Sequence, residues 1–355
     1  MKRFAPFVVR GNPAGHIRTA GRLLLFASAI AFIGCGVFQH KVDLKKIPVV
    51  AIEAVQADGS GMAPGEKSPL VVTVTQANGK KLTTEGKGKG PVRWRDLAVT
   101  STVASANAKG VLALSKDPRD SQGTLPHVTI AVPSHPDVKA AELDVPVRYD
   151  RNFRASFAGP SGSSGLDGQD GTDGSSGSMG STDPDHPSAG GDGSNGGNGF
   201  DGDNGHDGGD GPTVHVLVAI YDPPPQISNA PGQDGTTKTG PLLQVKVTSG
   251  KTEQLFLVDP AGGTLTVTSA GGSGGSGGRG GRGGRGGSGG SGIPSGRDGM
   301  NGSDGQSGLN GRDGNGGPIF VTYDPPVKPY LGAIQLRNPG GPAPVIKEGP
   351  AGPLW

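Results

Sequence analysis

Four glycine tracts of equal length constrain this chain more than any other feature. The tracts span residues 159–180, 190–211, 271–292 and 296–317, and each covers 22 residues with a glycine at every third position. Polyproline II has the same period, with three residues per turn. One glycine in each triplet gives a rod a bare face that another backbone can approach closely. Equal lengths are expected of rods that lie side by side, so we expect a bundle.

The tract at 271–292, tract three in chain order, has a different composition from the others. It repeats Gly-Gly-Ser and Gly-Gly-Arg, so two of its three faces are bare. A rod with two bare faces can contact neighbours on two sides. We therefore expect tract three at the centre of the bundle, and the tracts rich in Asp, Ser and Asn outside it.

The chain duplicates a unit of strand, rod, turn, rod and strand. Tracts two and four both end in Gly, which is followed by Pro, an apolar run and Tyr-Asp-Pro-Pro. The entrances match more loosely, with alternating apolar and polar residues at 153–157 before tract one and at 264–268 before tract three. Short turns make consecutive rods antiparallel, so the flanking strands meet at one end. The sequence predicts an antiparallel polyproline-II bundle with short β-strands over 151–337, followed by a Pro/Gly-rich tail at 338–355.

Residues 48–150 have the pattern of an all-β domain. About seven short β-branched or alternating runs are separated by turns such as Asn78-Gly79, and no helical period occurs. Such a series in about 100 residues favours an immunoglobulin-like β-sandwich, with Trp94 as its core aromatic. At the level of architecture the segment resembles bacterial surface Ig-like modules. The expected fold class is therefore all-β plus polyproline II.

The beginning of the chain has the pattern of an export signal. A basic stretch precedes the twelve-residue apolar run 23–34, and the only cysteine, Cys35, follows it. Twelve residues are too few to cross the roughly 30 Å hydrocarbon core of a bilayer as a helix, but they suit a secretory signal. One interpretation is a signal peptide, or a buried core strand, with an incidental cysteine.

The sequence Phe32-Ile33-Gly34-Cys35 resembles the lipobox of bacterial lipoproteins, although Phe stands where Leu is usual. The resemblance implies that 1–34 is a cleaved signal peptide, and that Cys35 carries diacylglycerol and palmitate. Residues 35–47 would then be a lipidated tether. It also implies an outer-membrane lipoprotein exposed at the cell surface and held to the membrane by its N-terminal lipid, although sorting to the inner membrane stays open.

The tracts resemble the polyproline-II bundles of snow-flea antifreeze protein and of some phage tail-tip adhesins. The resemblance covers about 150 residues and rests on triplet period and matched length. Collagen shares the glycine period, so a parallel trimer is an alternative, and disorder is another. Pro160 is the only proline in the tracts. Since collagen gains rigidity from proline and its strands run parallel, low proline content and tight turns favour a monomeric bundle.

The polar residues of the tracts offer few sites for chemistry. We find no catalytic set, and expect no enzyme and no resident cofactor. Asp201 and Asp203 are weak candidates for a Ca²⁺ site, since the nine-residue period of calcium-binding repeats is absent. Arg279, Arg282 and Arg285 share one face, and form either a charged edge or a stripe that binds anions or polysaccharides.

The resemblance to a lipobox, the glycine rods and the missing catalytic set together favour a non-enzymatic, lipid-anchored protein of the cell surface, structural or adhesive. After position 34 the chain holds 28 basic and 31 acidic residues, which speaks against nucleic-acid binding. Surface glycans or envelope proteins are the expected partners. A collagen-like trimeric surface protein is the alternative, as is a protein that binds ice, mineral or glycan.

We predict that Cys35→Ser leaves the precursor unprocessed and releases the protein from the lipid anchor, because the thiol is the site of lipid attachment. Labelling with a radioactive fatty acid and detergent partitioning measure this. Unchanged labelling and unchanged partitioning of the variant would contradict the lipoprotein assignment.

Overall fold

A computed structural model describes residues 41–355 apart from 229–234 and 238–239, and the description below concerns the compact unit that begins at His40. The signal peptide, Cys35 and most of the tether lie outside the described residues. Within the described ranges, no helix is long and apolar enough to cross a membrane. The chain is mainly β-structure, as the sequence predicted.

Two antiparallel sheets form the N-terminal domain. The first has the strand order β1-β2-β6-β5, with β3 paired to β2, and comprises β1 (Val49–Gln56), β2 (Lys67–Gln76), β3 (Lys81–Thr83), β5 (Ser105–Ala106) and β6 (Val111–Ala113). The second has the order β4-β7-β8 and comprises β4 (Ala98–Ser101), β7 (His127–Ala131) and β8 (Ala141–Asp144). Four short 3-10 helices lie before and between these strands: η1 (Leu44–Lys46), η2 (Gly86–Gly88), η3 (Trp94–Asp96) and η4 (Pro118–Asp120).

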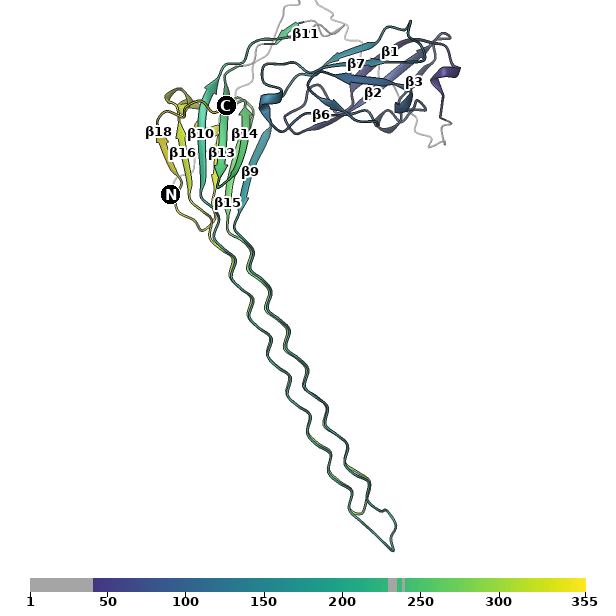
Figure 1. Ribbon diagram of the computed structural model, residues 1–355, viewed down its shortest axis with the longest axis vertical. Coiled ribbons are helices and arrows are strands. Elements are labelled where there is room, and N and C mark those ends of the chain that lie inside the picture. The colour runs from purple at the N-terminus through teal and green to yellow at the C-terminus, as the bar shows by residue number, and fades with distance from the viewer. Residues whose placement is uncertain (1–40, 229–234, 238–239) are drawn as a thin grey trace, which may run out of the picture. The chain divides into compact units, whose positions relative to one another are not determined.

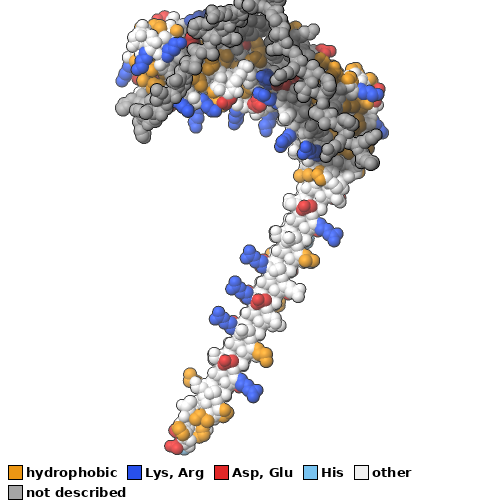
Figure 2. Space-filling model, turned by 180° about the vertical axis from the view of Figure 1, so that it is seen from behind, with side chains coloured by type: hydrophobic (Ala, Val, Ile, Leu, Met, Phe, Trp, Pro, Cys, Tyr) orange, Lys and Arg blue, Asp and Glu red, His pale blue; other side chains and the backbone are white. Residues whose placement is uncertain are grey.

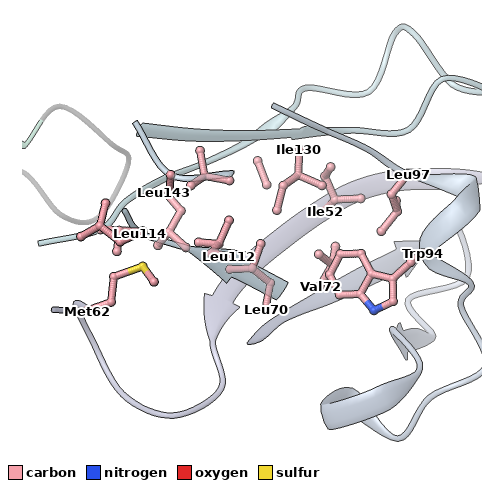
Figure 3. Close-up of a cluster of buried hydrophobic side chains, with 14 of the residues drawn as sticks. Ile52, Met62, Leu70, Val72, Trp94, Leu97, Leu112, Leu114, Ile130 and Leu143 are labelled. Atoms are coloured by element: carbon pink, nitrogen blue, oxygen red, sulfur yellow. The ribbon is translucent and has the colours of Figure 1, made fainter. Parts of the chain in front are cut away.

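A hydrophobic core lies mainly in this domain, with Leu242 and Leu257 added from later in the chain, and alternation along the strands builds it (Figure 3). On β2 the side chains of Leu70, Val72 and Val74 are buried, while the intervening residues are partly exposed. Trp94 is buried as predicted, and its indole N–H donates to the carbonyl oxygen of Glu85 (3.3 Å). The residues Trp94–Asp96 form a 3-10 turn, and β4 begins only at Ala98.

Two further sheets are built from the strands that flank the glycine tracts. A five-stranded sheet has the order β14-β13-β10-β16-β18, with β10 (Val214–Tyr221), β13 (Leu242–Ser249), β14 (Thr252–Val258), β16 (Ile319–Tyr323) and β18 (Val345–Glu348). A three-stranded sheet has the order β17-β15-β9, with β9 (Asn152–Ala158), β15 (Thr264–Ala270) and β17 (Ile334–Arg337). The 3-10 helix η5 (Pro325–Ala333) precedes β17, and β11 (Gln226–Ser228) pairs with β12 (Gly235–Thr237).

The predicted duplication is visible in how these strands pair. The two entry strands, β9 and β15, lie parallel with Asn152 opposite Thr264, and the two exit strands, β10 and β16, lie parallel with Val214 opposite Ile319. Apolar side chains from both sheets form one core, including Val216, Leu265 and Val321. All four tracts therefore leave the same pair of sheets (Figure 1).

The segment 338–355, delimited in the sequence as a tail, takes part in this structure. Its strand β18 pairs in parallel with β16, with Val345 opposite Phe320. Farther along, Leu354 is buried against Ala219 of β10. The last residues therefore extend the five-stranded sheet and cover part of it.

We predict that Gly110→Ala destabilises the N-terminal domain more than Gly79→Ala. Both glycines have positive φ (67° and 80°), so each alanine costs about 1–2 kcal/mol of backbone strain. A Cβ at Gly110 would also overlap the ring of Trp94, whereas a Cβ at Gly79 has nothing within 4 Å. Overpacking adds about 1–3 kcal/mol to the first variant only. Urea unfolding of both variants measures the difference, and equal losses would refute the packing against Trp94.

Candidate functional site: a hydrogen-bonded glycine shaft

The four glycine tracts lie side by side and form one shaft (Figure 1). The turns that join them, residues 181–189 and 293–295, lie at its free end. Along the tracts the backbone makes neither helical nor β-ladder hydrogen bonds. Its bonds run from each tract to its neighbours, and they recur every third residue.

Backbone hydrogen bonds define which tracts are neighbours. Tracts one and two are antiparallel, as are tracts three and four and tracts two and three. Tracts one and three are parallel, as are two and four. Examples of these bonds, in the same order of tract pairs, are Asp203 N–H to Leu166 O, Gly305 N–H to Gly281 O, Gly281 N–H to Phe200 O, Gly165 N–H to Ser276 O and Gly202 N–H to Gln306 O, all 2.8–2.9 Å.

Two tracts share the centre of the shaft. Tracts two and three each bond to all three others, whereas tracts one and four each bond to two. The buried glycine row that begins at Gly272 and ends at Gly290 confirms a central position for tract three. The prediction that the polar tract two lies outside was wrong. Tract two therefore has three neighbours although only one of its faces is glycine throughout.

Glycine is required because the backbones touch. A Cβ added at Gly283 would overlap the carbonyl oxygen of Gly302 in tract four, and one at Gly284 would overlap that of Thr172 in tract one. Both are backbone atoms that cannot rotate away. The two bare faces of tract three therefore meet two different neighbours, as its Gly-Gly repeat predicted.

A second kind of bond joins side chains to the backbone of the next tract. In tract two the last residue of seven successive triplets accepts the N–H of a residue in tract four at 2.7–2.9 Å: Asp192, Asn195, Asn198, Asp201, Asn204, Asp207 and Asp210. Tract four supplies acceptors to glycines of tract three from Asp298, Asn301, Asp304, Ser307, Asn310 and Asp313. In tract one, Asp167, Asp170 and Asp173 accept the backbone N–H groups of the three arginines of tract three. We call these side chains rung residues.

Rung residues supply the remaining acceptors for the backbone N–H groups of tract three. In the triplet from Gly281 to Gly283, the first N–H donates to Phe200 O of tract two (2.8 Å). The Arg282 N–H donates to Asp170 Oδ1 of tract one (2.7 Å), and the Gly283 N–H donates to Asp304 Oδ1 of tract four (2.8 Å). All three amides of one triplet are thus bonded, each to a different tract.

The two calcium candidates have different roles in the shaft. The carboxylate of Asp201 is a rung residue and accepts the N–H of Gln306 (2.7 Å). Asp203 lies at the other triplet position, where its own N–H donates to Leu166 O of tract one. Across the described residues, no group of three or more His, Cys, Asp or Glu side chains is arranged to hold a metal ion.

The three arginines keep the position that the triplet period predicted. Arg279, Arg282 and Arg285 are exposed on the side of tract three that faces away from its neighbours. No hydrogen bond or ion pair is formed by their guanidinium groups within the described chain. The structure therefore leaves these groups available to a partner.

The rung residues were missed in the sequence although the signal was present. In tract two, Asp or Asn ends each of seven consecutive triplets. Counting the acids alone hides this row, because three of the seven members are asparagines. What the two residue types share is the side-chain oxygen Oδ1, and that atom is the hydrogen-bond acceptor.

Comparison with known proteins gives no assignment. No family model matches the chain, and no curated protein matches it. Among solved structures the chain is similar to one described as the S-layer protein SbsC domains 4 and 5, at 14% identity, covering 60% of this chain and 98% of that one, with a TM-score of 0.19. A score this low carries no argument about fold or function.

We predict that Asp201→Ala lowers the stability of the shaft while Asp201→Asn and Asp203→Ala do not. Alanine removes the acceptor of the Gln306 N–H, which costs about 0.5–1 kcal/mol, whereas asparagine keeps Oδ1. Asp203 is equally exposed but accepts no such bond in the described chain, so it is a matched control. Thermal unfolding followed by circular dichroism measures the effect. Equal losses for Asp201→Ala and Asp203→Ala would show that the rung bond is not stabilising.

Proposed function

We propose that this chain is a non-enzymatic, lipid-anchored protein of the bacterial cell surface whose glycine shaft is a rigid structural or adhesive element. Lipid on Cys35 holds the protein to the outer membrane. The shaft then presents its polar rows and its free end, residues 181–189 and 293–295, to the surroundings. Glycans or proteins of the envelope are the partners of such a surface.

The fully bonded triplet from Gly281 to Gly283 is the observation that carries this proposal. A chain that only links two domains has no need to bond every amide of a triplet to a different neighbour. Four tracts tied in this way resist bending, because a bend stretches bonds to several tracts at once. At about 3.1 Å per residue, 22 residues give a rod of about 68 Å.

We further propose that each tract is a polyproline-II helix and that the shaft is a bundle within one chain. The threefold recurrence of every bond along the tracts supports this conformation, which has three residues per turn. Antiparallel pairing of tracts one and two, and of three and four, favours a monomer over a parallel collagen-like trimer. Ice or mineral binding is less favoured, since charged rows line the shaft.

The experiment that tests the surface role uses a short epitope tag inserted between Pro184 and Asp185. This position lies in the exposed turn at the free end of the shaft, where an insertion disturbs no tract. On intact cells of a bacterial host we expect an antibody to label the tagged protein. When the tagged protein also carries Cys35→Ser, we expect the antibody to detect it in the medium or the periplasm instead of at the cell surface.

Two results would contradict the proposal. Labelling of the tagged protein only after the cells are permeabilised would place the shaft inside the envelope. Equal surface labelling with and without Cys35 would show that lipid on Cys35 does not hold the protein at the surface. A circular-dichroism spectrum without polyproline-II character, or an obligate trimer in sedimentation, would favour disorder or collagen.

A further inference from the structure

Basic side chains stand out from the shaft, whereas acidic side chains lie against its surface (Figure 2). Three of the basic residues, Arg279, Arg282 and Arg285, occupy successive triplets of tract three and are exposed. Successive triplets of a polyproline-II helix are about 9 Å apart. We call these three residues the arginine row.

The backbone of each arginine is fixed on two sides by tract one. Each N–H donates to a carboxylate at 2.7 Å, from Arg279 to Asp167, from Arg282 to Asp170 and from Arg285 to Asp173. Each carbonyl oxygen accepts an N–H at 2.7 Å, from Gly168, Gly171 and Gly174 in the same order. The spacing of the row is therefore set by the shaft rather than by flexible loops.

The arginines and their aspartates occur together. Where tract three carries Ser273 instead of arginine, the residue opposite in tract one is Ser161, and the two hydroxyl oxygens are 3.2 Å apart. Ser276 and Ser288 likewise stand opposite serines, at the same separation of 112 residues. The chain thus places arginine and aspartate in three adjacent triplets at the middle of the shaft, and leaves the flanking triplets uncharged.

The arginine side chains extend farther from the shaft than the aspartate side chains do. Each aspartate of this edge is short and is tied to a backbone N–H, so it lies at the surface of the shaft. An arginine side chain is longer, and these three guanidinium groups have no side-chain partner in the described chain. The tracts hold eleven Asp and five Arg, so the shaft is formally acidic, yet a ligand that approaches tract three meets positive charge first.

We propose that the arginine row binds a linear anionic polysaccharide whose carboxylate or sulfate groups recur at about 9 Å. Guanidinium groups form paired hydrogen bonds with such anions, and a fixed row loses little freedom on binding. A second copy of the chain suits the row less well, because ten of the eleven aspartates of its tracts already accept a backbone N–H. This inference rests on the proposed function only in taking the shaft to be outside the cell.

The test measures binding of the purified full chain to two probes, heparin for sulfate groups and polygalacturonate for carboxylate groups. The main variant replaces all three arginines of the row by serine, the residue of the flanking triplets, so the shaft should keep its fold. One control is Arg297→Ser with Arg312→Ser, which removes the two arginines of tract four. A second control, Ser276→Arg with Arg282→Ser, keeps the number of charges but interrupts the row.

We expect at least one probe to bind, and the row variant to bind it roughly tenfold more weakly, since each exposed ion pair contributes up to about 1 kcal/mol. The tract-four variant should stay within about twofold, and the interrupted row should lose affinity despite its unchanged charge. Raised salt should weaken wild-type binding, because the row is exposed.

Three binding results would overturn the inference. These are no binding of either probe by the wild type, equal losses for the row variant and the tract-four variant, and unchanged affinity of the interrupted row. If sedimentation shows that the wild type is a dimer and the row variant is a monomer, the row serves self-association instead. Surface labelling of the tip tag is independent of all three, so failure here would leave the proposed function standing.

Discussion

The structure depends on finding acceptors for the backbone N–H groups of the tracts. An extended chain of threefold period makes no internal hydrogen bonds, and an unpaired buried amide costs about 1–3 kcal/mol. Carbonyl oxygens of neighbouring tracts supply part of the acceptors, and rung residues such as Asp170 and Asp304 supply more. Glycine follows from the same need, because carbonyls can reach amides across the shaft only where no Cβ intervenes.

The sheets at the base of the shaft set its register. The pairing of Thr264 with Asn152 in β15 and β9 has the separation of 112 residues that also joins Arg279 to Asp167. The offset that begins in the sheet thus continues along tracts one and three. A buried core with Val216 and Leu265 holds the strands, so the hydrophobic part of the fold aligns a part that has no apolar interior.

The sequence predicted what depends on period and length. Matched tracts gave the number and direction of the rods, and alternation gave the β-strands and the buried Trp94. Prediction from the sequence failed where the structure depends on hydrogen-bond partners that are distant along the chain. Tract two was placed outside because only one of its faces is glycine throughout, yet its backbone bonds to three tracts. The row that includes Asn195 and Asp201 was overlooked because acids were separated from amides. The four residues of β18, Val345–Glu348, gain their strand only by pairing with β16.

Amide hydrogen exchange resolved by residue distinguishes a hydrogen-bonded shaft from four unpaired rods. In tract two we expect slow exchange for Gly202 and Asp203, which donate to Gln306 O and Leu166 O, and fast exchange for Asp201, whose N–H has no acceptor in the described chain. In tract three we expect slow exchange for all three amides from Gly281 to Gly283. Uniformly fast exchange, or a single slow amide per triplet in every tract, would contradict the hydrogen-bonded shaft.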